Sequence, residues 1–392
     1  MSDQKNKIVL IIAGEASADL HGSNLVRAMK RLDPKISFLG IGGEKMENEG
    51  VKILFSSSDM AVVGLTEVFS RIPYIFRAHR QLKRILKETH PDLLILIDYP
   101  EFNLFLARSA KRFNVPVLYY ISPQVWAWRK GRIKKIARRV DRMATILPFE
   151  AALYRDSGLN VEYVGHPLLD AASKRVNSRE AVTEMGLMGG RPILGLLPGS
   201  RREEIENLLP LMIQAVDLLS SGYRDLKCVL PLASTISRDL VQSMISKSSV
   251  DIKISQGDIY KTLAVCDLAM VTSGTATLET AIMGIPMIVV YRASPLTFWI
   301  AKKVVKVPFI GLVNLVAGEE VVPELIQDEI TPQRLAREAM TILEDGRKKE
   351  NMIKKLKMVE ERLGSGGASA RTAGMALEMM ERQVNGENHT DC

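Results

Sequence analysis

The chain has 392 residues, of which 46% are hydrophobic and 25% are charged, a composition typical of a soluble globular protein. This length exceeds that of one typical domain, so we expect two lobes of roughly 150 to 200 residues, each with its own core. The sequence has no N-terminal secretory signal and no uninterrupted apolar span, which predicts a cytoplasmic protein without a transmembrane helix.

The net charge and the cysteine content limit the possible partners and the cellular compartment. The formal net charge of +8 indicates an anionic partner, without choosing among a nucleotide, a nucleic acid and an anionic lipid surface. The three cysteines, Cys228, Cys266 and Cys392, lack the spacing of a metal site, and the first two lie in apolar runs. A reducing compartment fits this pattern.

The N-terminal segment predicts a strand followed by a helix. Residues 8–13 form a continuous apolar run rich in β-branched residues, which is typical of a strand buried on both faces of a parallel sheet. The small residues after it, from Gly14 to Asp19, permit either a capped turn or the close approach of a ligand. Ser17 or Asp19 could cap the helix that runs toward Arg31.

An aspartate closes another strand of the first lobe. Residues 36–41 and 92–98 predict two more short strands, and the second of them ends in Asp98. A carboxylate in this position stands at the carboxyl edge of the sheet, where open α/β folds place their ligands.

The stretch from Val62 to Lys87 combines apolar residues at helical spacing with a run of cations. Its apolar positions include Leu65, Val68, Phe69, Ile72, Ile75 and Phe76. The pattern predicts either a helix that packs on the core or an interfacial segment whose apolar face enters a bilayer while its cations meet lipid phosphates.

A second cationic cluster follows Trp126 and Trp128. It contains Arg129, Lys130, Arg132, Lys134, Lys135, Arg138, Arg139 and Arg142. Charge runs are usually solvated helix faces, but the adjacent indoles also suit a membrane surface or an RNA backbone. Aromatic residues are otherwise sparse here, so nucleic acid is the weaker choice.

The alternation of predicted strands and helices restarts after Gly165-His166-Pro167, and we place the hinge between the two lobes there. His166 is either a ligand contact or a linker residue. Further strands are predicted at 115–121, 143–146 and 161–164 before the hinge, and at 193–197, 227–230, 252–254, 268–271 and 287–290 after it. The predicted fold class is α/β, with two doubly wound Rossmann-like lobes that face a cleft. The lobes comprise residues 1–166 and residues 167–384, the second including the C-terminal helices, and residues 385–392 are predicted to be disordered.

Two loops of the second lobe have the composition of an anion site. Residues 273–277 follow a strand and open a helix, so backbone N–H groups and short hydroxyls can approach a diphosphate. Glu279 lies in the first turns of that helix, where its carboxylate could accept both hydroxyls of a ribose. The alternative is an ordinary capped helix. The turn at Pro198-Gly199-Ser200 places Arg201 beside the same sheet edge.

The sequence lacks the characteristic motifs of several enzyme classes. A Gly-x-x-x-x-Gly-Lys-Ser/Thr loop, a Gly-x-Gly-x-x-Gly turn in the first lobe and a Gly-x-Ser-x-Gly turn are all absent, as is a His, Cys or Asp cluster with metal-ligand spacing. This argues against P-loop NTPases, redox enzymes and serine hydrolases.

Five motifs carry a resemblance to a known family. They are Gly14-Glu15-Ala16-Ser17-x-Asp19, Ser122-Pro123-x-Val125-Trp126-Ala127-Trp128-Arg129, Gly165-His166-Pro167, Leu197-Pro198-Gly199-Ser200-Arg201-x-x-Glu204-Ile205 and Ser273-Gly274-Thr275-Ala276-Thr277-Leu278-Glu279. In this order they resemble the lipid-A-disaccharide synthase family of inverting glycosyltransferases with the GT-B fold. The match runs from near residue 8 to beyond residue 316, with one departure at Ala18, where the family usually has glycine.

The resemblance implies a reaction and a set of roles. The donor is UDP-2,3-diacylglucosamine, the acceptor is 2,3-diacylglucosamine 1-phosphate (lipid X), and the products are UDP and a β-1',6-linked disaccharide. Asp98 becomes the candidate general base for the acceptor 6-hydroxyl. Gly14, Glu15, Ser17 and Asp19 are assigned to the acceptor side, and Arg201, Ser273, Gly274, Thr275, Thr277, Glu279 and Asn314 to the donor UDP. The family implies no metal ion and no other cofactor.

The resemblance also bears on partners and alternatives. Because both substrates carry acyl chains, it favours the interfacial interpretation of residues 62–87 and a protein associated peripherally with an anionic inner membrane. Nucleic acid is not an expected partner, and a homodimer through the C-terminal helices is left open. The rival interpretations are another GT-B glycosyltransferase, a UDP-N-acetylglucosamine 2-epimerase, or a basic nucleotide- or RNA-binding protein without catalysis.

Overall fold

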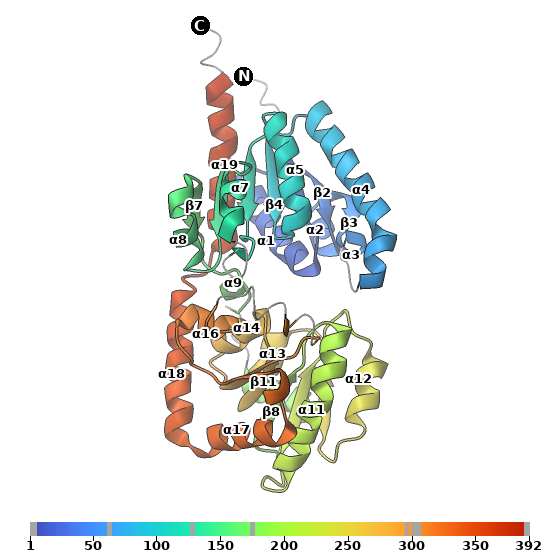
Figure 1. Cartoon of the computed structure of the whole chain (residues 1–392), viewed down its shortest axis with the longest axis vertical. Helices are drawn as coiled ribbons and strands as arrows, with labels where there is room; N and C mark the ends of the chain where they lie inside the picture. Colours follow the sequence, from blue (N-terminus) through green and yellow to red (C-terminus); the bar gives the residue numbers. More distant parts are fainter. Residues whose placement is uncertain are drawn as a thin grey trace. The chain divides into compact units, whose positions relative to one another are not determined.

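The computed structural model describes residues 6–60, 65–125, 130–172, 177–294, 298–299 and 307–387 (Figure 1). The chain forms two compact units, the first made of Met1–Pro167 with Ser365–Cys392 and the second of Leu168–Gly364. The backbone therefore passes from one unit to the other twice, once after Pro167 and once after Gly364.

The first unit is built on a seven-stranded parallel sheet in the order β3-β2-β1-β4-β5-β6-β7. Its strands are β1 (Ile8–Ala13), β2 (Ser37–Gly42), β3 (Val51–Ser56), β4 (Leu93–Ile97), β5 (Val117–Tyr120), β6 (Arg142–Thr145) and β7 (Asn160–Tyr163). Every residue of β4 is buried, and so is every residue of β1 after Ile8, which explains why both segments are continuous apolar runs.

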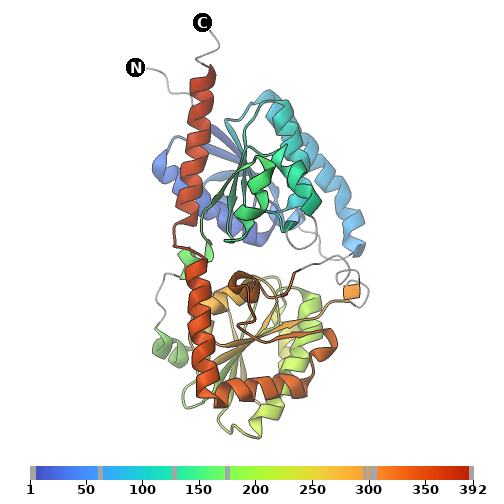
Figure 2. The same ribbon diagram turned by 60° about the vertical axis from the view of Figure 1, so that its left-hand side comes forward.

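Helices cover both faces of this sheet (Figures 1 and 2). They are α1 (Ala16–Leu32), α2 (Glu44–Asn48), α3 (Ser57–Met60), α4 (Leu65–Glu88), α5 (Pro100–Arg112), α7 (Ile133–Ala137), α8 (Glu150–Tyr154) and α19 (Ala368–Glu387). The last of them, α19, packs along α1, while α4 packs against α5. Leu82 and Leu86 of α4 join Leu10 and Leu94 of the sheet in one buried core.

The second unit contains a six-stranded parallel sheet in the order β10-β9-β8-β11-β12-β13. Its strands are β8 (Ile193–Leu197), β9 (Lys227–Pro231), β10 (Ile252–Ser255), β11 (Leu268–Thr272), β12 (Met287–Tyr291) and β13 (Glu324–Ile326). Its helices are α9 (Leu168–Ala172), α10 (Ser178–Glu184), α11 (Arg202–Ser220), α12 (Arg238–Ile245), α13 (Ile259–Leu263), α14 (Thr275–Ile282), α16 (Leu312–Ala317), α17 (Pro332–Glu344) and α18 (Gly346–Arg362).

Both sheets confirm the predicted α/β class, and both have a topological switch point. In the first sheet the strand order reverses between β1 and β4, where Ala13 pairs with Ile97. In the second it reverses between β8 and β11, where Leu197 pairs with Val271. Open α/β sheets bind ligands at such points, outside the carboxyl ends of the strands. The loops after these four strands are therefore the places to look for a site.

The structure differs from the sequence-based organisation in three respects. Strands β3 and β13 were not predicted. The predicted second lobe included all C-terminal helices, whereas α19 belongs to the first unit, because its apolar face packs on α1. The predicted disordered tail began at residue 385, but α19 continues to Glu387; residues 388–392 lie outside the described residues.

Helix α4 resolves the two interpretations of residues 62–87 only in part. Ala78, Leu82 and Leu86 form its core face, whereas Ile72 and Phe76 are 45% and 65% exposed. Ile75 is partly buried against the core. Residues 62–64 and the side chains of Leu65, Val68 and Phe69 lie outside the described residues. No helix in the described part of the chain is long and apolar enough to cross a membrane.

The docking of α19 on the first unit predicts the effect of a buried charge. Ala376 of α19 is fully buried, whereas Ala370, in the first turn of the same helix, is exposed. We expect Ala376→Asp to lower the midpoint of thermal unfolding by roughly 5–10 °C, because an unpaired carboxylate enters the core. Ala370→Asp serves as the matched control. Equal midpoints for the two variants, measured by circular dichroism, would contradict this packing.

Candidate active site

Asp98 lies directly after β4, in an unusual backbone turn. Asp98 and Tyr99 have φ angles of 46° and 43°, in the left-handed region that non-glycine residues seldom occupy. Pro100 then occupies the first position of α5. The structure thus places Asp98 at the carboxyl edge of the first sheet, as the sequence predicted, with a backbone conformation that the sequence did not reveal.

The Asp98 carboxyl group has a raised pKa. Burial and, secondly, the neighbouring Glu15 carboxylate raise this pKa, a hydrogen bond from the Tyr99 backbone lowers it, and the net result is a shift from 3.8 to about 6. At pH 7.5 a carboxyl group with a pKa of about 6 is mostly ionised and still basic enough to accept a proton. This matches the requirements for a general base near neutral pH.

Gly14 is needed because an aromatic ring lies directly over it. A Cβ atom at Gly14 would approach Cδ1 of Tyr99 to 2.5 Å, well inside van der Waals contact. The Tyr99 hydroxyl donates to the carbonyl oxygen of Met60 at 3.1 Å. The glycine after β1 and the tyrosine after β4 therefore fix the spacing of two adjacent strand ends.

The helix cap expected in the first loop is not formed, and Asp19 has a different function from the one expected. Neither Ser17 nor Asp19 caps α1, because the N-cap is Glu15 and no side chain bonds to the helix end there. Asp19 is buried and instead caps α2, where its two oxygens accept from the N–H groups of Gly43 at 2.6 Å, Lys45 at 3.2 Å and Met46 at 3.2 Å. Glu15 and Ser17 are exposed, so they remain able to contact a ligand.

The loop after β11 offers backbone donors more than hydroxyls. The Ser273 hydroxyl donates to the carbonyl oxygen of Ile310, and the Thr277 hydroxyl donates to that of Gly274, so both are used within the protein. Within the part of the chain that the structure describes, the N–H groups of residues 274–276 have no recorded partner. These N–H groups open α14, where the helix dipole also favours an anion.

Glu279 is a carboxylate without a recorded ion pair or side-chain hydrogen bond among the described residues. It lies on α14, is only partly exposed, and faces repulsion from Asp258. Burial, and secondarily Asp258, raise the pKa of Glu279 to about 7. Two hydroxyl donors would stabilise the ionised form of such a group, which agrees with the predicted ribose contact.

Arg201 is the N-cap residue of α11, and its side chain is 76% exposed. Glu204 occupies the amides of this turn, accepting from the N–H groups of Ser200 at 3.0 Å and Arg201 at 3.2 Å. Gly199 permits this approach, since a Cβ there would lie 2.2 Å from Glu204 Oε2. The Arg201 guanidinium group also pairs with Glu204 Oε1 at 3.3 Å, so an anion at this turn would meet a guanidinium group that already has a carboxylate partner.

Asn314 is buried and its amide is fully used inside the protein. Its Nδ2 donates to Val322 O at 2.8 Å and to Glu324 at 2.9 Å, and its Oδ1 accepts from the N–H groups of residues 321 and 322. This network leaves no amide group free for a direct bond to a phosphate, and the placement of Asn314 near the donor phosphates stays a prediction. Glu324 also accepts from the N–H groups of Ile310 and Gly311, so the network reaches the Ser273 hydroxyl through Ile310.

Two cations of the cluster that follows Trp126 and Trp128 form ion pairs, while Lys134, Lys135 and Arg138 are exposed. Arg132 forms a bidentate pair with Glu101, and Arg142 pairs with Glu162 and Glu378. Trp126, Trp128 and Arg129, which the sequence grouped with them, lie outside the described residues. His166, at the expected hinge, is buried, and its pKa is lowered to about 3 by burial and by His21, so it is neutral at pH 7.

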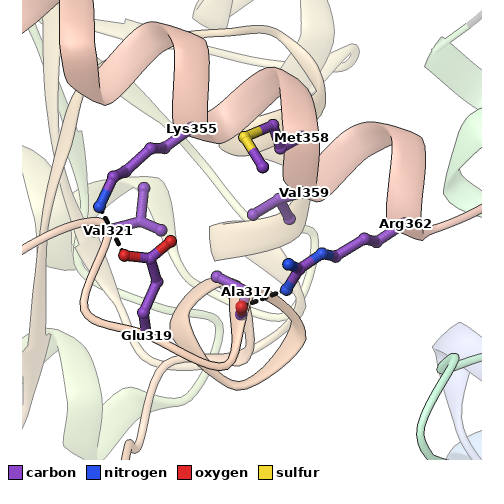
Figure 3. Close-up of a pocket in the computed structure, with 7 residues that line it drawn as sticks. All are labelled: Ala317, Glu319, Val321, Lys355, Met358, Val359 and Arg362. Atoms are coloured by element: carbon purple, nitrogen blue, oxygen red, sulfur yellow. Dashed lines mark hydrogen bonds and ion pairs between the residues drawn. The ribbon is translucent and has the colours of Figure 1, made fainter.

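Two cavities in the described part of the chain lie away from these loops. One cavity of about 10 Å³ lies between α18 and the segment after α16, beside the pairs Lys355–Glu319 and Arg362–Ala317, and holds no more than a water molecule (Figure 3). A hollow of about 530 Å³ lies at the amino ends of β1 to β3, away from the strand ends that carry Gly14 and Asp98. In the described ranges, no group of three or more His, Cys, Asp or Glu residues could hold a metal ion.

Sequence reasoning missed three residues that organise these loops. Asn103 and Tyr119 donate to the carbonyl oxygen of Asp98, and Glu324 organises the segment around Asn314. Asn103 follows Asp98-Tyr99-Pro100 by one helical turn, which is a usable signal for a side chain that bonds back to a helix start. Tyr119 and Glu324 approach from other parts of the chain, and local sequence carries no sign of that.

Comparison with known proteins gives close relatives along the whole chain. A family model described as lipid-A-disaccharide synthetase matches residues 9–376. The lipid-A-disaccharide synthases of Geobacter sulfurreducens and Geobacter metallireducens are 48% and 49% identical to this chain, and each alignment covers 98% of the chain and 100% of the relative.

Solved structures with a similar fold are more distant in sequence. A UDP-GlcNAc 2-epimerase from Neisseria meningitidis, bound to UDP-GlcNAc, is 13% identical with a TM-score of 0.61 and covers 95% of this chain and 99% of its own. A calicheamicin glycosyltransferase is 12% identical with a TM-score of 0.59, covering 96% of this chain and 99% of its own. These structures share the two-unit GT-B fold, and the sequence relatives favour the synthase over the epimerase and the RNA-binding protein.

The raised pKa of Glu279 predicts a pH-dependent affinity for UDP. If the ribose hydroxyls of UDP donate to the ionised Glu279 carboxylate, affinity should weaken roughly tenfold as the pH falls from 8 to 6 through the pKa of about 7. Glu279→Gln should bind UDP more weakly at pH 8, and its affinity should lack the part of the pH dependence that comes from the Glu279 carboxylate. The UDP diphosphate titrates in the same range, so calorimetry must compare wild type and variant at each pH. Parallel pH curves would contradict the assignment.

Proposed function

We propose a specific reaction from one premise, which is that this chain belongs to the lipid-A-disaccharide synthetase family and is a glycosyltransferase. The proposed donor is UDP-2,3-diacylglucosamine and the proposed acceptor is 2,3-diacylglucosamine 1-phosphate. The products are UDP and the β-1',6-linked disaccharide 1-phosphate. The observation that supports this most is Asp98, a carboxylate of raised pKa at a topological switch point.

Asp98 is the proposed general base. Its carboxylate takes the proton of the acceptor 6-hydroxyl while that oxygen forms a bond to the anomeric carbon of the donor sugar. The bond from the anomeric carbon to the UDP oxygen breaks on the opposite face, so the configuration inverts. A carboxyl pKa of about 6 leaves Asp98 ionised near neutral pH, ready to accept this proton.

The second unit is proposed to hold the departing nucleotide. The N–H groups of residues 274–276 and the dipole of α14 stabilise the negative charge that develops on the diphosphate. Arg201 adds positive charge from an exposed side chain that also pairs with Glu204, and Glu279 accepts hydrogen bonds from the ribose hydroxyls. No metal ion or other cofactor is part of this proposal.

An anionic membrane surface is the proposed partner of α4. The exposed Ile72 and Phe76 lie on the same helix as Arg77, Arg80, Lys83, Arg84 and Lys87. An apolar patch beside cations suits the boundary between acyl chains and lipid phosphates, where both substrates would be found. The proposed location is therefore the cytoplasmic surface of the inner membrane, with peripheral attachment.

The role of Asp98 predicts a selective loss of chemistry. Asp98→Asn should lower turnover about 100- to 10,000-fold, the range of a lost general base, while the affinity for UDP stays within about twofold. Turnover is measured as disaccharide product by mass spectrometry, and UDP affinity by calorimetry. Asp92→Asn, at the amino end of the same strand, is the matched control and should retain turnover. Turnover in Asp98→Asn equal to that of wild type would remove Asp98 from this role.

The membrane proposal predicts weaker binding to vesicles. Replacing Ile72 and Phe76 with serine should lower partitioning onto vesicles rich in anionic lipid roughly tenfold or more, because two apolar side chains no longer enter the bilayer. Met340 and Ile353, apolar residues of the second unit with 39% and 38% exposure, give a matched double serine control. If both double variants sediment with vesicles like wild type, α4 is not the contact.

A further inference from the structure

We infer that Asn103 and Tyr119 are positioning residues that aim the Asp98 carboxylate, an inference that rests on the proposed function of Asp98. Both side chains are fully buried. The Tyr119 hydroxyl donates to the Asp98 carbonyl oxygen at 2.5 Å, and Asn103 Nδ2 donates to the same oxygen at 2.7 Å. Two donors from different elements, β5 and α5, thus converge on one backbone atom.

The backbone that they hold is strained. Asp98 and Tyr99 are consecutive non-glycine residues with left-handed φ angles, whereas elsewhere in the described chain such residues occur singly. A bulky aromatic residue is rare in this region, and such conformations persist only where the surroundings impose them. Strained residues of this kind cluster at functional sites.

The hydrogen bonds fix the direction of the Asp98 side chain. At one end of the residue, the N–H of Asp98 donates to Tyr120 O at 3.2 Å. At the other end, its carbonyl oxygen receives the two side-chain donors. Asn103 Nδ2 also lies 3.2 Å from Ile97 O, so it joins the last residue of β4 to the turn. With both peptide groups held, the Cα–Cβ bond of Asp98 points in one direction.

The chemistry of Asn103 points to this function rather than to core filling. Its Oδ1 atom is buried and has no hydrogen-bond partner among the described residues. An unpaired buried acceptor is unfavourable, and an apolar side chain would fill the space without it. What the amide contributes is the pair of donor contacts to Ile97 and Asp98.

Tyr119→Phe tests the inference, because it removes one donor and keeps the ring. We expect kcat for disaccharide formation to fall about 10- to 100-fold, with the donor KM and the UDP affinity unchanged within about twofold. The acidic limb of the pH–rate profile should move to lower pH, since a relaxed turn exposes the Asp98 carboxyl group to water. Asn103→Ala should act in the same direction and provides a second measurement if Tyr119→Phe does not fold.

Tyr154→Phe is the matched control for a purely structural effect. It removes an equally buried hydroxyl, which is bonded to Ser122 at 2.9 Å and does not contact Asp98. It should lower the unfolding midpoint as Tyr119→Phe does, while kcat and the pH limb stay as in wild type. The inference would be overturned if Tyr119→Phe and Asn103→Ala both kept the wild-type kcat and the wild-type acidic limb of the pH–rate profile while Asp98→Asn abolished activity. That result would leave the proposed reaction standing. Full activity of Asp98→Asn would overturn both.

Discussion

The burial of one carboxylate at the end of a buried strand is the constraint on which the first unit's site depends. Strand β4 ends at Ile97, and the next residue turns sharply so that Asp98 stays at the sheet edge, partly shielded from water. The resulting pKa of about 6, raised from 3.8, corresponds to about 3 kcal/mol of disfavoured ionisation. This penalty is absent below about pH 4, where the carboxyl group is protonated in both the folded and the unfolded chain, and it destabilises the folded state as the pH rises through about 6. At neutral pH the ionised Asp98 therefore makes the folded state less stable than a neutral side chain at this position would. Active sites commonly reduce the stability of the folded protein in this way.

The surrounding structure offsets this instability with packing and hydrogen bonds. Tyr99 lies over Gly14, which joins the ends of β4 and β1, and Asp19 secures α2 beside them through three backbone N–H groups. These contacts involve no ligand, so the first loop is held in place before any substrate binds. Rigid support of this kind is what a general base needs, because small displacements reduce proton transfer sharply.

The second unit differs from the first in the charge of the ligand group that it is proposed to bind. In the proposed reaction its loop receives a diphosphate through backbone N–H groups, since the hydroxyls of Ser273 and Thr277 are already bonded within the protein. Glu279 is kept close to half ionised at pH 7 by burial and by Asp258. A ligand that brings hydroxyl donors would stabilise the ionised form of Glu279, as the proposed ribose contact requires.

The sequence predicted the parts of this arrangement that depend on local pattern. Continuous apolar runs identified β1, β4, β8 and β11, and the motifs after them located Gly14, Asp98, Arg201 and Glu279. Strand β3 escaped prediction because its burial is mixed, and β13 because it has only three residues. The direction of the Thr277 hydroxyl, the burial of Asn314 and the docking of α19 depend on contacts between distant segments. The left-handed turn at Asp98 is held by Tyr119, which lies twenty-one residues away in the sequence, and no local sequence pattern predicts this contact.

The pKa of the Asp98 carboxyl group in the intact protein tests the central claim most directly. It can be measured by ¹³C NMR of protein labelled at aspartate side chains, with Asp98→Asn used to assign the signal. A titration midpoint of about 6 is predicted. A midpoint near 4, the ordinary value for an exposed aspartate, would show that the turn does not shield the carboxylate and would contradict the account.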